Sequence, residues 1–483
     1  MEKWANLQKM PLEKIQALQN KKLKRFVRHF VPYSPYYREL FIKNNLSFSD
    51  IQTTDDLVKL PFTTKEDLAP SDDDPGRPRK FMLQPDEELI KKYASKGALL
   101  KILWQKITKQ DYKKALEWQF KPIHLHFTTG RTAKPTAFGY SAYDLENIKQ
   151  AGERMFNVAG ATRDMTSING FPYSPHLAFW QAFFGFTQIG LTSLQTGGGK
   201  VMGTQKIIDA IESLKAKLVV FIPGYAYHLM REAASQQKDY SNIELVITGG
   251  EKLSPGFRDK IREFLQSMGS ANPKILATYA MTEGKVGWIQ CHEKSGYHLY
   301  PDIEYFELVN EEGQRVKEGE KGQIVYTALD WQSSMVLRYK TGDLTDNIET
   351  NPCPHCQRTV PRINPNIQRS SEFKEFKLAK VKGELVNLNL FMPLISGLAE
   401  VEEWQVEIKK KNNDPLELDE IYLYVSPRPG VNWESFKTKL EKLVYADIGV
   451  GVIIEQMDTQ EILGRLGMET ELKEKRLLDS RPQ

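Results

Sequence analysis

Short apolar runs alternate with helix-forming segments between residues 205 and 279, and this alternation constrains the fold more than any other feature. Three runs read as buried strands, and two segments between them have helical periodicity: strands Lys217–Ile222, Ile243–Thr248 and Lys274–Tyr279, helices Gln205–Ala216 and Pro255–Met268. This order is typical of a parallel sheet with crossover helices. Ligands of such sheets bind beyond the carboxyl ends of the strands. The turns at Pro223, Gly249 and Tyr279 are therefore the first places to look for a site.

The two ends of the chain have different patterns. The first 120 residues predict mostly helix, including amphipathic helices over Lys14–Phe30 and Leu103–Trp118. The last hundred residues predict antiparallel strands, one amphipathic helix and a final strand: Glu402–Ile408, Glu420–Val425, Trp433–Val444 and Val452–Gln456. The expected fold class is thus α/β, with a large N-terminal domain of mixed and parallel sheets flanked by helices and a small α+β C-terminal domain.

Composition excludes several classes of protein. A net charge of +4 on 483 residues gives no strong field for nucleic acid. No stretch of about 18 uncharged apolar residues occurs, so we expect no membrane span and no membrane partner. Residues Met1–Pro11 contain no apolar signal-peptide core, and three cysteines do not make a disulfide framework. The expected location is the cytoplasm.

Three polar motifs carry candidate site residues, and the first two follow predicted strands. Thr128–Thr136 (Thr-Thr-Gly-Arg-Thr-Ala-Lys-Pro-Thr) is a turn whose amides, hydroxyls and lysine suit polyphosphate, although it lacks the spacing of a P-loop. Tyr279–Glu283 offers a ring for a base, a hydroxyl for a phosphate and a carboxylate for magnesium. Tyr339–Asp343 contains a glycine that allows a tight turn and an acid that suits ribose hydroxyls. Each motif alone is weak: a polar surface turn explains the first equally well, a capped strand-to-helix turn explains the second better, and a lone Thr-Gly-Asp means little.

Together and in this order, the motifs resemble those of the adenylate-forming superfamily, which contains acyl-CoA synthetases, luciferases and peptide-synthetase adenylation domains. Within it, the chain is most similar to the phenylacetate–CoA ligase family. Two further runs, Ile222–Ala226 (Ile-Pro-Gly-Tyr-Ala) and Thr248–Glu251 (Thr-Gly-Gly-Glu), resemble the family's Pro-Ser-Tyr-Ala-Leu and Gly-Ala-Glu segments. The resemblance extends from about Pro32 to Pro482. It implies ATP-dependent activation of a carboxylic acid to an acyl-AMP, followed by thioesterification with coenzyme A.

The resemblance also implies roles for individual residues. The pyrophosphate end of ATP would be held by Thr128, Thr129, Gly130, Thr132 and Lys134. The nucleoside and α-phosphate would contact Gly250, Glu251, Tyr279, Thr282 and Asp343. Glu283 would bind Mg²⁺, Arg369 resembles the arginine that opens the family's hinge, and Lys473 matches the catalytic lysine, with Lys475 as its rival.

Several positions depart from the family pattern. Arg131 and Ala133 replace a Thr and a Gly of the phosphate loop, Ser371 replaces the first Asp of the hinge, and Leu472 replaces the Gly before the catalytic lysine. A Cβ at position 133 would crowd a loop that approaches phosphate, whereas the charge of Arg131 would compensate. These changes leave open a homologue that binds nucleotide but has lost catalysis.

All three cysteines fall at positions suited to a metal. Cys353-Pro-His-Cys356 has the spacing of a zinc knuckle, and Cys291 is followed by His298 in a Cys-x6-His segment. Members of the resembled family often show both segments. Three thiolates and one imidazole complete a tetrahedral set, which predicts structural Zn²⁺; His292 and His355 are alternative fourth ligands. Unrelated buried thiols are the competing interpretation.

The acid and the acceptor are less determined. Aromatic residues gather where the resembled family builds its acyl pocket, which favours an aryl or other apolar acid and makes Tyr173, His176 and Tyr225 candidate substrate contacts. Ordinary core aromatics are the alternative. A carrier-protein thiol is the alternative to coenzyme A, and the chain is expected to be a monomer or homodimer. We expect a body over residues 1–368 that includes the zinc knuckle and a mobile lid over 369–483 that carries the catalytic lysine.

Overall fold

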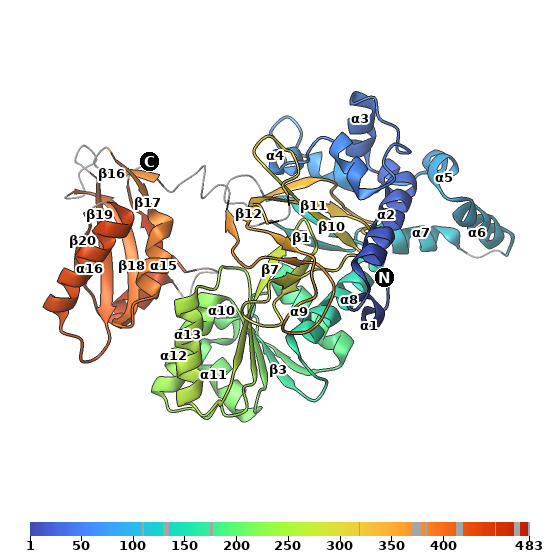
Figure 1. The fold of residues 1–483 in the computed structure, drawn as a ribbon. Helices are drawn as coiled ribbons and strands as arrows, with labels where there is room; N and C mark the ends of the chain where they lie inside the picture. The colour runs from blue at the N-terminus through green and yellow to red at the C-terminus, as the bar shows by residue number, and fades with distance from the viewer. Residues whose placement is uncertain are drawn as a thin grey trace. The chain divides into compact units, whose positions relative to one another are not determined.

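The computed structural model describes residues 1–108, 111–128, 135–173, 177–317, 319–369, 378–381, 384–411, 419–449, 451–467 and 474–481 (Figure 1). The chain divides into two compact units. The first contains residues 1–164, 173–192 and 278–368, and the second contains residues 165–172, 193–277 and 369–483.

The first unit begins with helices, as the sequence predicts: α1 (Trp4–Leu7), α2 (Leu12–His29), α3 (Pro35–Lys43), α4 (Lys65–Leu68), α5 (Glu87–Tyr93), α6 (Lys96–Ile107) and α7 (Tyr112–Phe120), with short 3-10 turns over Val31–Tyr33, Thr54–Lys59 and Arg77–Phe81. The single helix expected over Leu103–Trp118 is wrong, because α6 and α7 are separate helices. The side chain of Asp111 accepts hydrogen bonds from the backbone N–H groups of Lys113 and Lys114 and so caps the start of α7. The apolar periodicity of the sequence continues across the break, but the cap at Asp111 starts a new helix.

The rest of the first unit is built around antiparallel strands. A hairpin of β1 (His124–Phe127) and β2 (Ala137–Tyr140) leads into α8 (Ala142–Ala159), and α9 (Leu177–Ile189) packs closely on α8, where Gly152 and Gly185 meet. The strands β10 (Glu304–Val309), β11 (Gly322–Ala328) and β12 (Tyr339–Thr345) pair in antiparallel order. A second group pairs the end of β7 with the strands β8 (Val286–Ile289), β9 (Tyr297–His298), β14 (Arg362–Ile363) and β13 (Ile348–Glu349).

The second unit contains the parallel sheet that the strand–helix alternation predicts. The strands β3 (Thr166–Asn169), β5 (Leu218–Phe221), β6 (Leu245–Thr248) and the first half of β7 (Lys274–Met281) pair in parallel. The strand β4 (Thr192–Gln195) and four helices accompany them: α10 (Gly199–Met202), α11 (Thr204–Ser213), α12 (Pro223–Ser235) and α13 (Pro255–Ser267). β5 and β6 are buried at every position, as expected for strands covered on both faces.

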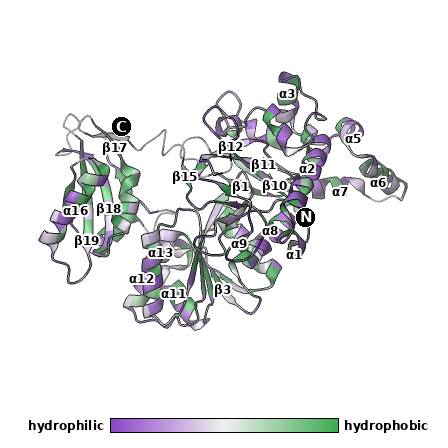
Figure 2. Ribbon diagram, in the orientation of Figure 1, coloured by the Kyte–Doolittle hydropathy of each residue, from purple (hydrophilic) through white to green (hydrophobic). Residues whose placement is uncertain are grey.

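The C-terminal part of the second unit is an α+β lobe, as predicted. Its sheet has the order β20-β19-β18-β21, with β18 (Val401–Lys410) antiparallel to β19 (Asp419–Pro427) and β20 (Ile453–Gln456) and β21 (Leu477–Asp479) parallel to their neighbours. One face packs on α15 (Phe391–Ser396) and α16 (Trp433–Ile448), and Tyr424 packs with α17 (Thr459–Leu466) in a smaller cluster. Figure 2 shows the hydrophobic residues along β18 and β19. Short strands β15 (Gln368–Arg369), β16 (Leu378–Val381) and β17 (Glu384–Asn387) and a turn over Leu388–Leu390 precede α15.

Candidate functional site

Two hydrogen bonds join the second and third sequence motifs. The Tyr279 hydroxyl donates to Asp343 Oδ2 at 2.8 Å, and the Tyr339 hydroxyl donates to Glu283 Oε1 at 2.8 Å. Each bond runs from the aromatic residue of one motif to the acid of the other. Segments about sixty residues apart in the chain therefore form one site in the first unit, with Asp343 buried and Glu283 half-buried.

A β-bulge, and not the tight turn expected from the sequence, presents Asp343. Between the pairs Gln323↔Leu344 and Val325↔Lys340, β11 advances two residues while β12 advances four. Gly342 lies in this bulge with φ +78°, a conformation that glycine adopts without steric cost. The backbone N–H of Asp343 donates to Thr341 Oγ1 at 3.1 Å, which fixes the acid at the bulge.

Tyr279 lies within β7, two residues before its end, so the strand continues two residues beyond the end that the sequence predicted. The antiparallel pairing of β7 with β8 sets Tyr279 opposite Trp288, and the two ring centroids are 5.5 Å apart. Trp288 is fully buried and donates from Nε1 to Glu304 at 2.6 Å. Burial raises the pKa of Glu304 to about 8. Near neutral pH the neutral carboxyl group therefore accepts the hydrogen bond from Trp288, whose ring packs on Tyr279.

A buried ion pair holds the turn that carries Thr282 and Glu283. Lys285 Nζ donates to Asp144 Oδ2 at 2.8 Å and to the Gly139 carbonyl at 2.7 Å, and neither charged side chain has exposed area. Asp144 also accepts from the backbone N–H groups of Gln332 and Ser333. Burial lowers the pKa of Lys285, while the carboxylate opposes that shift. Nothing in the sequence motifs pointed to this pair, which links the turn to β2 and α8.

The phosphate-loop motif is described only at its ends. The Thr128 N–H donates to the Thr136 carbonyl, and the Thr136 N–H donates to Thr128 Oγ1 at 3.0 Å. These bonds close the loop where β1 ends and β2 begins. The predicted phosphate contacts Thr129, Gly130, Thr132 and Lys134 lie outside the described residues, as do Arg131 and Ala133.

The remaining nucleotide contacts expected from the sequence belong to the second unit. β6 ends at Thr248, and Gly250 follows with φ +86°, so the turn before Glu251 requires a residue that tolerates the left-handed region. Arg369 ends β15, and its side chain lies outside the described residues.

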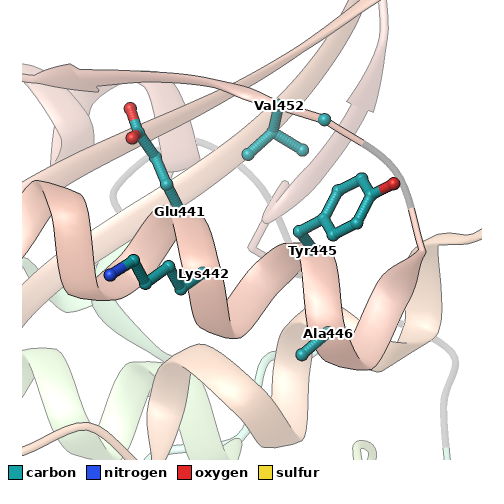
Figure 3. Close-up of a pocket in the computed structure, with 6 residues that line it drawn as sticks. Glu441, Lys442, Tyr445, Ala446 and Val452 are labelled. Carbon is teal, nitrogen blue, oxygen red and sulfur yellow. The ribbon is translucent and has the colours of Figure 1, made fainter.

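The candidate substrate residues divide between the two units. Tyr173, 45% exposed, packs its ring on Phe179 in the first unit. Tyr225, in the second unit, exchanges a hydrogen bond with Thr204 Oγ1 at 3.0 Å. His176 lies outside the described residues. An open hollow of about 450 Å³ lies elsewhere, lined by Glu441, Lys442, Tyr445, Ala446, Gly451 and Val452 (Figure 3). None of the predicted site residues lines it.

Lys473 also lies outside the described residues, but Glu474 and Arg476, which follow it, make close contacts within the second unit. Arg476 donates to Glu403 and to the Trp404 carbonyl of β18, and its guanidinium lies 4.9 Å from the centroid of the Phe257 ring on α13. The Glu474 carboxylate contacts Gly224 at the start of α12 so closely that an added Cβ there would meet it at 2.5 Å. Lys475 is exposed.

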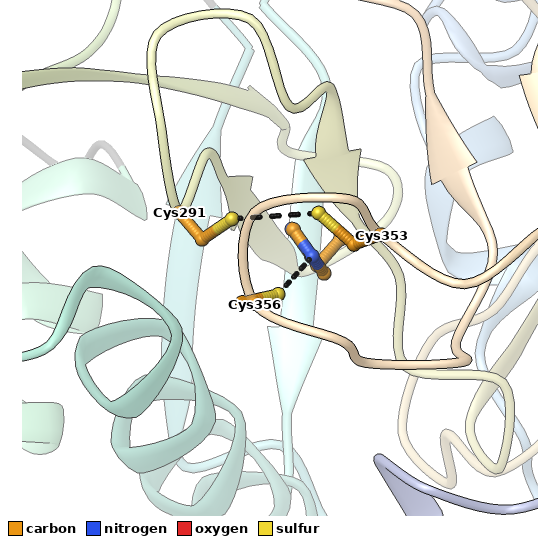
Figure 4. Close-up of side chains that lie close together, drawn as sticks. Cys291, Cys353 and Cys356 are labelled. Carbon is orange, nitrogen blue, oxygen red and sulfur yellow. Dashed lines mark hydrogen bonds between the residues drawn. The ribbon is translucent and has the colours of Figure 1, made fainter.

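The four predicted metal ligands do lie together, in the first unit (Figure 4). The candidate ligand atoms of Cys291, His298, Cys353 and Cys356 all lie within 4.8 Å of one another. Cys291 follows β8, His298 ends β9, and both other cysteines come from the loop between β13 and β14.

Their geometry fits a tetrahedral ion. The sulfurs of Cys291 and Cys353 are 3.6 Å apart, and Cys356 Sγ lies 3.2 Å from His298 Nε2. Zn–S bonds of about 2.3 Å in a tetrahedron give sulfur–sulfur edges of roughly 3.8 Å. His298 Nδ1 faces the Ile289 carbonyl at 3.4 Å, which directs Nε2 toward the thiols. Sharing of a proton with Cys291 lowers the pKa of Cys356 and raises that of Cys291. The alternative ligands His292 and His355 stack on each other, with ring centroids 3.9 Å apart.

Comparison with known proteins supplies the family. A sequence profile described as "AMP-binding enzyme" matches residues 66–328, more than half of the chain. The chain belongs to the AMP-binding enzyme family. Among curated relatives of this AMP-binding enzyme is the phenylacetate-coenzyme A ligase of Thermus thermophilus, 26% identical over 369 residues, covering 76% of this chain and 73% of that protein. The phenylacetate-coenzyme A ligase of Escherichia coli K12 is 24% identical over 368 residues, covering 75% of this chain and 72% of that protein.

Solved structures confirm the adenylate-forming fold class. A 2-hydroxyisobutyryl-CoA ligase in its postadenylation state matches with a TM-score of 0.75 at 20% identity, covering 98% of this chain and 91% of that one. The same ligase in its thioesterification state matches with a TM-score of 0.61 at 21% identity, covering 100% and 94%.

Proposed function

We propose that this chain is an AMP-forming acid–thiol ligase, which activates a carboxylic acid as an acyl adenylate and transfers the acyl group to coenzyme A. The observation that carries the proposal is the pair of crossed hydrogen bonds, Tyr279 to Asp343 and Tyr339 to Glu283. These bonds bring together the Tyr279 ring, the carboxylates of Asp343 and Glu283, and the turn that contains the Thr282 hydroxyl. The same reaction class is supported by relatives that are phenylacetate-coenzyme A ligases and that align with most of this chain.

The nucleoside end of ATP would use Tyr279 and Asp343. The Tyr279 ring, backed by Trp288, offers an aromatic face to adenine, and the Asp343 carboxylate accepts hydrogen bonds from ribose hydroxyls. Gly250 and Glu251 are the proposed adenine border, and Arg369 is the proposed hinge arginine. The departing pyrophosphate would be surrounded by Thr128, Thr129, Gly130, Thr132 and Lys134.

Magnesium would bind at Glu283. A half-buried carboxylate with one oxygen already oriented by the Tyr339 hydroxyl provides the oxygen ligand that Mg²⁺ prefers. Bound there, the ion would neutralise phosphate charge. Thr282, in the same turn, would donate its hydroxyl to the α-phosphate.

The first step needs no protein base, because the acid is already an anion. Its carboxylate oxygen attacks the α-phosphorus, a new P–O bond forms, and the bond to pyrophosphate breaks with both electrons leaving on pyrophosphate. In the second step the acceptor thiol loses its proton to solvent, and the thiolate attacks the acyl carbon, so that a C–S bond forms and the C–O bond to AMP breaks. Lys473 would stabilise the negative charge that develops in the first step. We further propose that residues 369–483 form a mobile lid that delivers this lysine and then withdraws.

The structural part of the proposal concerns zinc. The set Cys291, His298, Cys353 and Cys356 would bind one Zn²⁺ with all four positions filled by protein, which makes the ion structural. It would link the connection after β8 to the loop before β14. This site lies next to the β7–β8 strand pair that contains Tyr279.

An acid-dependent pyrophosphate-exchange screen tests the function. Purified protein, ATP and Mg²⁺ would be offered aryl, aliphatic and hydroxy acids, and the proposal expects exchange with at least one, favouring aryl or other apolar acids. Addition of coenzyme A should then release AMP and form the thioester. Adenylate formation without coenzyme A consumption would favour a carrier-protein thiol as acceptor. ATP binding without exchange for any acid would refute catalysis.

The assignment of the lysine has a matched control in the chain. Lys473→Ala should reduce exchange by about a hundredfold or more, since a cation at the transferring phosphoryl group is lost. Lys475→Ala, two residues away and exposed, should retain activity. The opposite result would transfer the role to Lys475.

A further inference from the structure

Helix α6 exposes an apolar stripe that the proposed ligase function does not use. Leu100, Leu103, Trp104 and Ile107 are 66%, 54%, 58% and 71% exposed. At 3.6 residues per turn these positions fall within an arc of about 100°. All twelve residues of α6 are described and none is buried, and Figure 1 shows α6 at the edge of the first unit with α5 and α7.

The charged residues of α6 itself have one sign. Lys101 and Lys106 lie on opposite sides of the stripe, each about 60° beyond its border on the helix circumference. The run from Leu89 to Gln110 contains six lysines, at positions 91, 92, 96, 101, 106 and 109, and no acidic residue. The whole chain carries only +4, so this segment concentrates positive charge next to exposed apolar side chains.

This combination is that of a helix lying in the plane of a bilayer surface. Leucine, isoleucine and tryptophan enter the boundary between headgroups and acyl chains, while flanking lysines reach back to anionic headgroups along their aliphatic stems. Each lysine near an anionic surface adds attraction that salt screens. Among the described residues no helix is long and apolar enough to cross a bilayer.

We propose that α6 is an interfacial anchor that binds the protein peripherally to anionic lipid surfaces. The expectation of no membrane partner rested on the absence of a spanning segment, and that criterion does not detect a stripe of four residues. Charge complementarity selects the occupant, because an all-lysine border favours a uniformly anionic surface over a neutral one.

Vesicle flotation tests the proposal with the full chain. Phosphatidylcholine vesicles with about 30 mol % phosphatidylserine would be compared with phosphatidylcholine alone, at about 0.1 M and about 0.5 M salt. We expect binding to the anionic vesicles and its loss at high salt. Leu103→Glu and Trp104→Glu should each weaken binding by about tenfold or more, because each replaces an inserted apolar side chain with an anion. Lys101→Glu with Lys106→Glu should remove the preference for anionic lipid.

Ile42→Glu is the matched control, because Ile42 is 76% exposed but stands on α3. It should bind vesicles like the parent, and unchanged thermal unfolding should show that all variants are folded. Equal recovery with neutral and anionic vesicles, or unchanged binding of the α6 variants, would overturn the proposal. Self-association that disappears in Trp104→Glu while no vesicle binds would also overturn it, since the stripe would then cover a second copy. Specific binding of an acidic protein without vesicle binding would do the same.

Discussion

Replacement of Lys285 by Met should destabilise the first unit strongly and should be partly reversed by a second substitution at Asp144. In the native protein the two side chains are fully buried, and Lys285 Nζ lies 2.8 Å from Asp144 Oδ2. Methionine keeps the length of the lysine stem but removes the charge. The Asp144 carboxylate then stays buried with only its backbone N–H donors.

The magnitude follows from burial. Removing one partner of a buried ion pair costs about 3–5 kcal/mol, because the remaining charge is uncompensated. Asp144→Asn should also be costly, since it leaves a buried ammonium. In the double variant no buried charge remains, so its loss should be smaller than the sum of the two single losses by about 2 kcal/mol or more.

Urea unfolding followed by tryptophan fluorescence measures this coupling as a double-mutant cycle. The control cycle uses the exposed pair Lys121 and Glu117, whose side chains are 60% and 59% exposed, and should give less than about 1 kcal/mol. Additivity at Lys285 and Asp144 within about 0.5 kcal/mol would refute the reasoning. Pyrophosphate exchange provides a second readout, because Lys285→Met loosens the turn carrying Glu283 and should lower the rate even where the protein stays folded.

Three further predictions address other parts of the molecule. Burial raises the pKa of Glu304 from 4.5 to about 8. The stability that the neutral carboxyl group contributes is therefore complete below pH 4.5 and is lost as the pH rises through 8. The total loss is up to about 5 kcal/mol, from 3.5 pH units. Glu304→Gln should remove that pH dependence from urea midpoints measured between pH 5 and 9, and an unchanged slope would contradict the assignment. Asp343→Ala should lower kcat/KM for ATP by about ten- to a hundredfold, whereas Tyr279→Phe, which removes only the hydroxyl, should cost less; equal effects would argue against ribose binding. Cys356→Ser should lose about one zinc per chain and melt at lower temperature, whereas His355→Ala should retain the metal by elemental analysis; zinc loss in the histidine variant would mean a different fourth ligand.

Local patterns predicted the fold well where the chain is regular. The parallel strands β5 and β6 lie within the predicted ranges, because continuous apolar runs closed by Pro-Gly and Gly-Gly leave few alternatives. The helix predicted over Leu103–Trp118 was wrong because the cap at Asp111 interrupts an otherwise continuous apolar pattern. Periodicity alone does not show such a break.

The candidate site was predictable in its residue types but not in its supporting contacts. The spacing of Cys353 and Cys356 predicted a cluster that the structure assembles with Cys291 and His298. The tight turn expected at Gly342 is a bulge, because strand register depends on the partner strand and not on the Thr-Gly-Asp motif. Contacts between Lys285 and Asp144 join residues 141 positions apart and leave no local signal.

The three cysteines of the proposed zinc site also predict how the protein responds to air. Sulfurs 3.6 Å apart need only a small movement to form a disulfide once no cation holds them as separate thiolates. Protein stripped by a chelator without reductant should therefore become oxidised between Cys291 and Cys353 and fail to take metal back. Each further step of oxidation, to sulfinic or sulfonic acid, would make that loss permanent. Reductant during purification should therefore preserve the fold next to the β7–β8 strand pair that contains Tyr279, in addition to keeping the thiols reduced.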